Sequence, residues 1–283
     1  MSFEFVEKLE FNSEYFDLYK LSESAYAAIS KENSVMRSNA GFVNLGDFSL
    51  VIDTTMSIKA AEDLKKATLQ YTKKDPKFIV ITHFHIDHVI GNSLFDQSTL
   101  IITSDRTLNS IKTENQKRIE EIRNMDLRYI AKIEESLKVE QDEEKRQIAQ
   151  RDLKFYKSVR AENFFLRDPD LSFKKEFILY GKERTVQLKT FNKAHTDGDV
   201  IVYIPSEKVM FAGDLLFANR DPWLGSGDPD GWVKVIENEL LNFDFKVVVP
   251  GHGNLASKEE FVKEKKYIKV KKNLLLRGLN RIC

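Results

Sequence analysis

The chain has 283 residues, of which 42 % are hydrophobic and 31 % charged, as expected for a soluble globular protein of one large or two smaller domains. Its 44 basic and 44 acidic residues balance, so the total charge gives no general attraction to nucleic acid or anionic membranes. The single cysteine, Cys283, excludes a disulfide within the chain. The sequence contains no signal-peptide pattern and no apolar stretch of about 18 residues, so we expect a cytoplasmic protein without a membrane partner.

The N-terminal part of the chain predicts strands around one helix. Residues 1–55 contain short runs of alternating apolar and polar side chains, a pattern typical of β-strands. Residues 57–71 place apolar side chains at helical spacing, and Ser57 is a candidate for the N-cap of that helix. Residues 75–82 predict a turn followed by a buried strand, and residues 99–104 predict another short strand.

The next part of the chain is helical. Residues 92–168 contain no glycine and no proline, and their apolar side chains recur at steps of three to five. We predict two long helices, at residues 106–138 and 142–162, which form a hairpin or a bent rod. They would make up a helical insertion, residues 105–165, within a single domain that spans residues 1–283.

Strand patterns return after the insertion. Residues 175–191 and 199–214 each predict a pair of strands. An amphipathic helix at 231–243, a strand at 246–253 and a C-terminal helix at 257–279 complete the chain. This order predicts an α+β fold in which two sheets pack face to face with helices outside.

Three of the five histidines lie in the stretch ITHFHIDHVIGN, residues 81–92. His83 and His85 stand two positions apart in an extended segment, so both point to the same side and can share one metal ion. Asp87 and His88 follow a bend and can face a second ion. Imidazole and carboxylate ligands suit zinc, iron or manganese. Burial of these groups without a metal would leave their polar atoms unsatisfied.

The remaining histidines and one aspartate lie far along the chain, each where a strand meets a loop. His195 lies in KAHTDGD, His252 in VPGHGN and Asp214 in MFAGDLLF. A carboxylate at the end of an apolar strand can bridge two metal ions. We therefore predict that all five histidines form one site with Asp214.

These motifs resemble, in the same order, the successive metal motifs of the metallo-β-lactamase superfamily, over about residues 35–255. The resemblance implies an αββα four-layer sandwich of two mixed β-sheets flanked by helices, with a dinuclear metal site at one edge. The ligands it implies are His83, His85 and His195 for the first metal, Asp87, His88 and His252 for the second, and Asp214 as the bridge. It also gives Asp53, in LVIDTT, a supporting role behind the histidine loop, although a turn aspartate explains that residue equally well.

The cofactor implied by the resemblance is a pair of divalent metal ions, most simply zinc, with iron or manganese as alternatives. Metal coordination lowers the pKa of water from 15.7 to about 7. The resemblance therefore implies a metal-dependent hydrolase, in which hydroxide on the dinuclear metal attacks a small ester, thioester, lactone or amide. Asp87 is the catalytic residue in this scheme because it would orient the hydroxide. The motifs are similar in style to those of the glyoxalase II and lactonase branches.

Two other activities use similar motifs. One is a phosphodiesterase or nuclease of the ribonuclease Z type, with the helical segment as an RNA-binding arm. The near-equal basic and acidic content of that segment argues against nucleic acid as a partner, because phosphate contacts need a cationic excess. The other is an iron-dependent persulfide oxygenase, which metal analysis would distinguish from a zinc hydrolase.

The substrate pocket is expected beside the metals. The glycine- and proline-rich loop 218–232 follows Asp214 closely, and its Trp223 either packs within the loop or forms an apolar wall for a small-molecule substrate. Phe164 and Phe165 are costly to leave in water, so we expect the insertion to cap the site, with one of these rings shaping the pocket. A second subunit is another place where the apolar stripe of the insertion can be buried, which would make a homo-oligomer.

Overall fold

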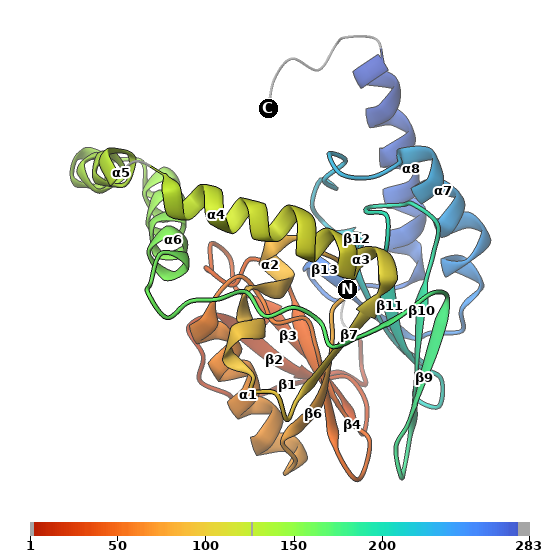
Figure 1. Ribbon diagram of the computed structural model, residues 1–283. Helices are drawn as coiled ribbons and strands as arrows, with labels where there is room; N and C mark the ends of the chain where they lie inside the picture. Colours follow the sequence, from red (N-terminus) through yellow and green to blue (C-terminus); the bar gives the residue numbers. More distant parts are fainter. Residues whose placement is uncertain (1–2, 126, 277–283) are drawn as a thin grey trace.

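The computed structural model describes residues 3–125 and 127–276, so Cys283 lies outside the described residues. Two β-sheets pack face to face, and helices cover their outer faces (Figure 1). The predicted four-layer αββα sandwich is confirmed. Within the described ranges, no helix is both long enough and apolar enough to cross a membrane.

The first sheet has eight strands, which lie in the order of the sequence. They are β1 (Glu7–Leu9), β2 (Phe16–Lys20), β3 (Ala25–Ser30), β4 (Ala40–Asn44), β5 (Ser49–Ile52), β6 (Pro76–Val80), β7 (Leu100–Ser104) and β8 (Leu171–Phe173). Neighbours are antiparallel up to β5 and parallel from β5 to β8. Helix α1 (Ile58–Thr72) provides the crossover that the parallel pair β5–β6 requires. As predicted, Ser57 caps this helix and accepts a hydrogen bond from the Ala60 N–H at 3.3 Å.

The second sheet has five strands in the order β13-β12-β11-β10-β9. They are β9 (Glu176–Tyr180), β10 (Thr185–Thr190), β11 (Val200–Ile204), β12 (Val209–Ala218) and β13 (Val247–Gly253). The two predicted strand pairs are confirmed, and β12 pairs in parallel with β13. The outer helices are α7 (Pro229–Asn238), the short 3-10 turn η3 (Leu240–Asn242) and α8 (Lys258–Leu276).

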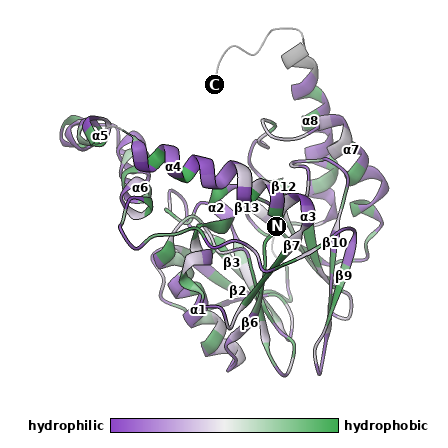
Figure 2. Cartoon of the chain, viewed as in Figure 1, coloured by the Kyte–Doolittle hydropathy of each residue, from purple (hydrophilic) through white to green (hydrophobic). Residues whose placement is uncertain are grey.

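The main core lies between the two sheets. Leu50 and Ile52 of the first sheet share one apolar cluster with Val202 and Phe211 of the second, and each is at most 2 % exposed. Burial of a side chain of this size contributes about 1.5–3 kcal/mol. In Figure 2 the strands are largely hydrophobic, whereas α4 carries many hydrophilic residues. The sandwich therefore provides a rigid support from which strand ends can present polar side chains.

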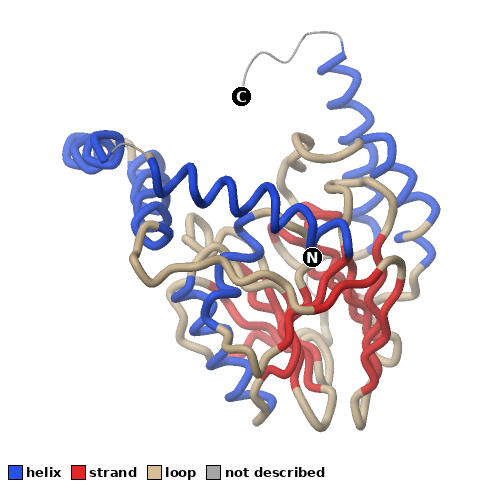
Figure 3. Tube along the Cα trace, in the orientation of Figure 1, coloured by secondary structure: helices blue, strands red, loops and turns tan. Residues whose placement is uncertain are grey.

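Helices occupy most of the chain between β7 and β8. They are α3 (Asp105–Ser110), a π-helical turn η2 (Ile111–Asn115), α4 (Gln116–Asn124), α5 (Leu127–Val139) and α6 (Glu143–Val159). Figure 3 shows the α3–α4 run crossing one end of the sandwich, with α5 and α6 beyond the first sheet.

The structure corrects two predictions about this segment. The helix predicted over 106–138 is not continuous, because Met125 adopts an extended conformation (φ −59°, ψ 138°) and ends α4. No glycine or proline marks that break, so composition did not reveal it. The short strand β8 was not predicted either. It pairs in parallel with β7 after the helices have returned the chain to the edge of the first sheet. The second predicted helix, 142–162, corresponds to α6.

Candidate metal centre

The seven predicted ligands converge at one edge of the sandwich, where strands of both sheets end. Four of them follow β6 and lie in or next to the short helix α2 (Ile86–Val89), which continues into the 3-10 turn η1 (Ile90–Leu94). The others come from the loop after β10 and from β12 and β13. Their potential ligand atoms form two groups, and within each group all atoms lie within 4.8 Å of one another. The groups are His83, His85, His195 and Asp214, and Asp87, His88 and His252.

The first group brings three imidazole nitrogens together. His85 Nδ1 lies 3.1 Å from His83 Nε2 and 3.0 Å from His195 Nε2. Asp214 Oδ2 lies 3.6 Å from His83 Nε2 and 3.3 Å from His195 Nε2. Lone pairs that face one another at such distances repel unless a proton or a cation lies between them, so this arrangement suits a metal ion.

Asp214 also reaches the second group. Its Oδ1 lies 3.1 Å from His88 Nε2, and its Oδ2 lies 3.3 Å from His252 Nε2. His252 Nε2 is in turn 3.4 Å from Asp87 Oδ2, and His88 Nε2 is 4.0 Å from the same oxygen. One carboxylate therefore contacts imidazoles of both groups.

Two buried atoms of this cluster lack a hydrogen-bond partner. They are His88 Nε2 and Asp214 Oδ1, in side chains that are at most 3 % exposed. Buried polar atoms are nearly always hydrogen-bonded, and an unpaired one points to an ion or a water. The donor set of imidazoles and carboxylates without thiolate is suited to two divalent cations. The residues present therefore fit a dinuclear metal site.

The electrostatics favour the protonation states that bind metal. Burial and the neighbouring His88 lower the pKa of His83 well below its usual value. Burial and the neighbouring His195 lower the pKa of His85 to about 4. Burial opposes ionisation of Asp214, yet the imidazoles around it, His252 first, lower the pKa of this carboxyl well below its usual value. Near pH 7, His83 and His85 are therefore neutral and Asp214 is ionised.

The pKa of His88 is shifted in the opposite direction. Burial favours the neutral ring, but the charges of Asp214 and Asp53 prevail and raise the pKa well above its usual value. In the metal-free protein a proton on this ring therefore compensates the two carboxylates, and metal binding would release it.

A second layer of hydrogen bonds orients the rings. Asp53 Oδ2 lies 2.8 Å from His88 Nδ1, and its carboxylate also accepts the N–H and the hydroxyl of Thr82, each at 2.8 Å. This contact supports the role expected for Asp53, whose φ of 56° is in the left-handed region. His85 Nε2 lies 2.9 Å from Ser226 Oγ, and His195 Nδ1 lies 3.2 Å from the carbonyl oxygen of Trp223. Such partners fix ring orientation and tautomer in metal sites.

A glycine allows the backbone to approach Asp214. A Cβ atom at Gly251 would lie 1.8 Å from Asp214 Oδ1, far inside contact distance. The glycine before His252 in VPGHGN is thus required by packing against the carboxylate.

Two asparagines that the sequence analysis did not single out hold the site together. The Asn39 side chain donates to the carbonyls of Pro250 and Gly253 at 2.9 and 2.8 Å and is 3 % exposed. Asn115, in η2, donates to the carbonyl of Phe84 at 2.5 Å. Neither belongs to a recognisable motif, because each acts on a loop that is distant in sequence.

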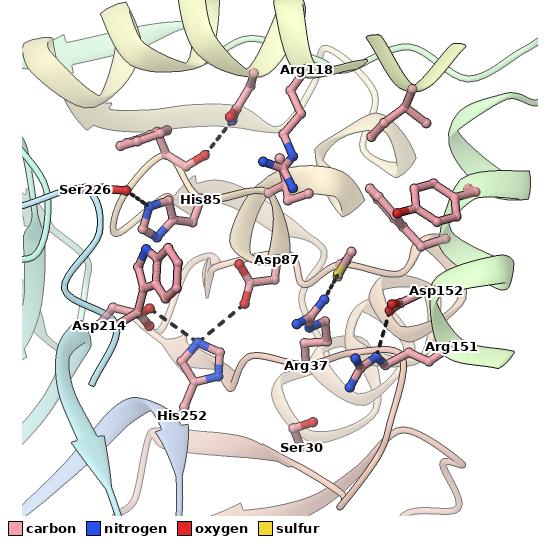
Figure 4. A pocket seen from close by; sticks show the side chains of 18 of the residues that line it. Ser30, Arg37, His85, Asp87, Arg118, Arg151, Asp152, Asp214, Ser226 and His252 are labelled. Carbon is pink, nitrogen blue, oxygen red and sulfur yellow. Dashed lines mark hydrogen bonds and ion pairs between the residues drawn. The ribbon is translucent and has the colours of Figure 1, made fainter. Parts of the chain in front are cut away.

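A cavity of about 1070 Å³ opens over the centre (Figure 4). Ligand residues on its wall include Asp87, Asp214 and His252. The aromatic residues of its wall are Phe84, Phe155, Tyr156, Phe217 and Trp223, and Trp223 is 62 % exposed.

The expectation that Phe164 or Phe165 shapes this cavity is wrong. Phe164 is 5 % exposed and belongs to the apolar cluster beneath the helices, where the Arg123 guanidinium lies over its ring at 5.7 Å. Phe165 is 56 % exposed and does not line the cavity. The insertion instead contributes Phe155 and Tyr156, which place the inner face of α6 on the same cavity as the candidate ligands.

Comparisons with known proteins agree with this geometry. The sequence matches the family model described as the metallo-beta-lactamase superfamily over residues 34–102 and 120–252. A search of curated proteins found no match.

Solved structures show the same fold. A metallo-beta-lactamase from Pontibacter korlensis is 18 % identical, with a TM-score of 0.65, over 90 % of this chain and 99 % of that one. TMB-1 is 19 % identical, with a TM-score of 0.66, over 92 % of this chain and 100 % of its own. The DIM-1 metallo-beta-lactamase, in a structure exposed to ceftazidime, is 18 % identical, with a TM-score of 0.64, over 94 % and 99 %. At these identities the likeness concerns the fold alone.

Proposed function

This chain belongs to the metallo-beta-lactamase superfamily, and we propose that it is a metal-dependent hydrolase of small esters, thioesters, lactones or amides. The observation that carries the proposal is the position of Asp214. Its carboxylate contacts imidazoles of both ligand groups, while Asp214 Oδ1 and His88 Nε2 have no hydrogen-bond partner. Although these two atoms lie 3.1 Å apart, they form no hydrogen bond with each other, and a metal ion bound by each ligand group would engage both of them.

In this proposal each ligand group holds one ion and Asp214 is shared. The ligands are His83, His85 and His195 in one group, and Asp87, His88 and His252 in the other. Zinc is the proposed native metal, with iron or manganese as alternatives, because the donors are nitrogen and carboxylate oxygen. Asp53 would orient His88 through its 2.8 Å contact with Nδ1.

Metal ions bound there would lower the pKa of water and polarise a carbonyl group. Asp87 is proposed as the catalytic carboxylate. It lines the cavity, and its side chain is 19 % exposed. Burial raises the pKa of this carboxyl, but His88 and His252 outweigh burial and lower it. An ionised Asp87 would orient the attacking water.

The aromatic walls would bind the apolar part of the substrate. Phe84, Phe155, Tyr156 and Trp223 provide apolar surface in a cavity that is large enough for a small organic molecule. A small molecule is the proposed substrate in place of a nucleic acid, because the helical segment carries nearly equal numbers of basic and acidic residues. The proposed cytoplasmic location follows only from the sequence composition.

The test is metal analysis joined to a substrate screen. Protein purified without added metal is expected to contain up to two transition-metal ions per chain, to hydrolyse at least one ester, thioester, lactone or amide, and to lose activity on chelation. Asp214→Asn should lose at least one ion and about 10²-fold or more in kcat/KM. Asp244→Asn, at a carboxylate that is 74 % exposed, is the matched control and should change neither.

Full metal content and activity in Asp214→Asn would refute the shared-ligand role. Oxygen from labelled solvent should appear in the product. Consumption of oxygen gas during turnover, with iron as the bound metal, would refute hydrolysis and support the persulfide oxygenase.

A further inference from the structure

We propose that Arg37 and Arg118 form an oxyanion-binding subsite in this cavity, so that the preferred substrates carry a carboxylate or phosphate group on the part that is not cleaved. Both residues line the same cavity as Asp87, Asp214 and His252. Figure 4 shows their side chains entering it from different elements, Arg118 from α4 and Arg37 from the loop between β3 and β4. This inference rests on the proposed hydrolytic function.

The two guanidinium groups are not neutralised by neighbouring carboxylates. Three other cations of the wall have acidic neighbours: Arg151 lies 3.2 Å from Asp152, Lys117 3.9 Å from Glu121 and Lys31 4.0 Å from Asp17. Among residues 3–125 and 127–276, Arg37 and Arg118 have no such ion pair, and the polar contact of Arg37 is with the Met56 sulfur at 3.8 Å. Unpaired guanidinium groups beside a cavity favour carboxylate or phosphate, whose geometry they match.

The acidic residues of the wall do not offset this charge. Asp87 and Asp214 belong to the metal ligand groups, and Glu121 and Asp152 face the paired cations. Glu114 is the remaining acidic residue of the wall, whereas Arg220 adds a further cation that has no ion pair within the described part of the chain. An anionic ligand would therefore enter a cavity whose wall carries an excess of positive charge.

Arg37 is held in place by its backbone. Its φ of 62° lies in the left-handed region, which costs an arginine about 1 kcal/mol or more. The neighbouring Met36 and Ser38 are buried, and the Ser38 hydroxyl donates to the carbonyl of Asp87. On the other side, Asn33 Nδ2 donates to Gln147 Oε1 of α6 at 2.7 Å. Residues 33–38 thus connect the loop that carries Asp87 to helix α6 of the insertion, and Arg37 lies between the two contacts.

Arg118 is placed by the π-helical turn η2, which begins two turns of helix before it. Such turns insert a residue into a helix and are frequent at functional sites. Asn115, at the end of η2, is 2 % exposed and donates to the Phe84 carbonyl in the histidine loop. This contact fixes the start of α4 over the cavity, and Arg118 lies on the first turn of α4.

Tyr156 shows that both cations act on the same region. Burial raises the pKa of this phenol, and the positive charges of Arg118 and Arg37 oppose that rise. Tyr156 also lines the cavity. A bound carboxylate or phosphate would therefore accept hydrogen bonds from the two guanidinium groups and from the Tyr156 hydroxyl, and the Phe155 ring lies beside Tyr156.

The test uses three esters that differ only in the group at the end of the same two-carbon chain: 3-(4-acetoxyphenyl)propionate, its neutral propanamide analogue and 2-(4-acetoxyphenyl)ethyl phosphate. The wild-type protein should hydrolyse at least one anionic ester with a kcat/KM about tenfold or more above that of the amide. The more reactive of the two anions identifies carboxylate or phosphate as the group recognised. Arg37→Gln and Arg118→Gln should each lose this preference, mainly through KM, and leave the amide unchanged within about twofold.

Arg118→Lys keeps the positive charge but not the planar guanidinium that can donate two parallel hydrogen bonds. It should retain part of the preference for the anionic esters. Arg146→Gln, an exposed position of α6 that does not line the cavity, is the matched control and should behave as wild type. Metal content and circular dichroism of all variants should equal those of the wild type.

A binding measurement separates this inference from the proposed function. Calorimetric titration with 3-(4-hydroxyphenyl)propionate and with propyl phosphate reports the subsite whether or not an ester is cleaved. Arginine-dependent binding in a protein that hydrolyses none of the esters would refute the proposed activity but not the subsite. Hydrolysis with equal kcat/KM for anionic and neutral esters, together with anion binding that is unchanged in both glutamine variants, would refute the subsite and leave hydrolysis standing.

Discussion

The metal edge and the helical insertion differ in how tightly the structure constrains them. At the metal edge, His83, His88, His195 and Asp214 are at most 3 % exposed and are fixed by neighbouring strands. In the insertion, α5 leaves Leu127 and Val139 exposed at 66 % and 77 %. Residues of η2, α4 and α6 on the inner side of the insertion belong to the apolar cluster of the sandwich, and α3 contacts β7 and β8. The comparison indicates that the sheets determine the chemistry, whereas the insertion shapes the cavity around it.

The largest effect is expected from adding one methyl group at the metal edge. Gly251→Ala would place its Cβ 1.8 Å from Asp214 Oδ1, so the loop or the carboxylate must shift. We expect metal loss and a fall in kcat/KM of about 10²-fold or more, measured by metal analysis and kinetics. Ala149→Gly in α6 makes the reverse change, the loss of one methyl group, in the insertion. It should lower the free energy of unfolding by about 1 kcal/mol and leave the metal content unchanged. Equal metal loss in both variants would show that the metal edge is no more tightly constrained than the insertion.

The next effect concerns the inner side of the insertion. Ile119 in α4 is 3 % exposed and belongs to the apolar cluster beneath α1 and the insertion. Ile119→Ala should lower the free energy of unfolding by about 2–5 kcal/mol, because it leaves a cavity. Metal affinity should stay the same. The exposed neighbour Glu120→Ala should change stability by less than about 0.5 kcal/mol in the same denaturation experiment.

Asp53→Asn tests the layer behind the ligands. The substitution weakens the carboxylate contact with His88 Nδ1 while preserving the size of the side chain. Metal affinity should fall about 10–100-fold in competition with a chelator. Asp75→Asn, on an exposed turn, is the control. An unchanged affinity in Asp53→Asn would show that the backbone alone orients the ring.

A smaller effect is expected at Glu264 of α8, which is remote from the insertion. Glu264 Oε1 accepts the Phe217 N–H at 2.8 Å, Oε2 has no hydrogen-bond partner, and burial raises the pKa of this carboxyl well above its usual value. Above about pH 4.5 the unfolded chain loses the proton of this carboxyl, whereas the folded protein keeps it. The free energy of unfolding therefore falls as the pH rises from that value toward the raised pKa.

Glu264→Gln should remove that dependence. It should stabilise the protein by about 1 kcal/mol or more at pH 8, with little gain at pH 4, as measured by denaturant unfolding at both values. A gain that is the same at both pH values would show that the carboxyl is ionised in the folded state.

The smallest effect is expected on the outer side of the insertion. Val139→Gln at the end of α5 changes a side chain that is already 77 % exposed, so stability, metal content and kcat/KM should stay within error of wild type. A change in molecular mass by light scattering would instead indicate that this surface contacts a second copy of the chain.

Much of the fold could be predicted from the sequence, and so could the grouping of the seven candidate ligands at one edge of the sandwich. The strands were recognisable because buried β-strands are apolar and end at glycine, proline or polar residues, as in KFIVIT and VMFAGD. The ligands were recognisable because four of them lie within six consecutive positions, 83–88, and the others follow strands in short motifs. In such segments, local backbone geometry determines the direction of the side chains, so sequence spacing carries the information.

Tertiary structure alone decided the cavity walls and the supporting contacts. Phe164 and Phe165 are equally apolar in sequence, yet one is buried in the core and the other is exposed, because their positions depend on the path of the chain after α6. The Asn39 contacts with the His252 loop and the placement of Arg37 and Arg118 in one cavity likewise involve segments that are far apart in sequence. At the break, the Met125 carbonyl accepts a hydrogen bond from Arg160 at 2.9 Å. Packing between distant segments sets these positions, and no local pattern of residue types encodes it.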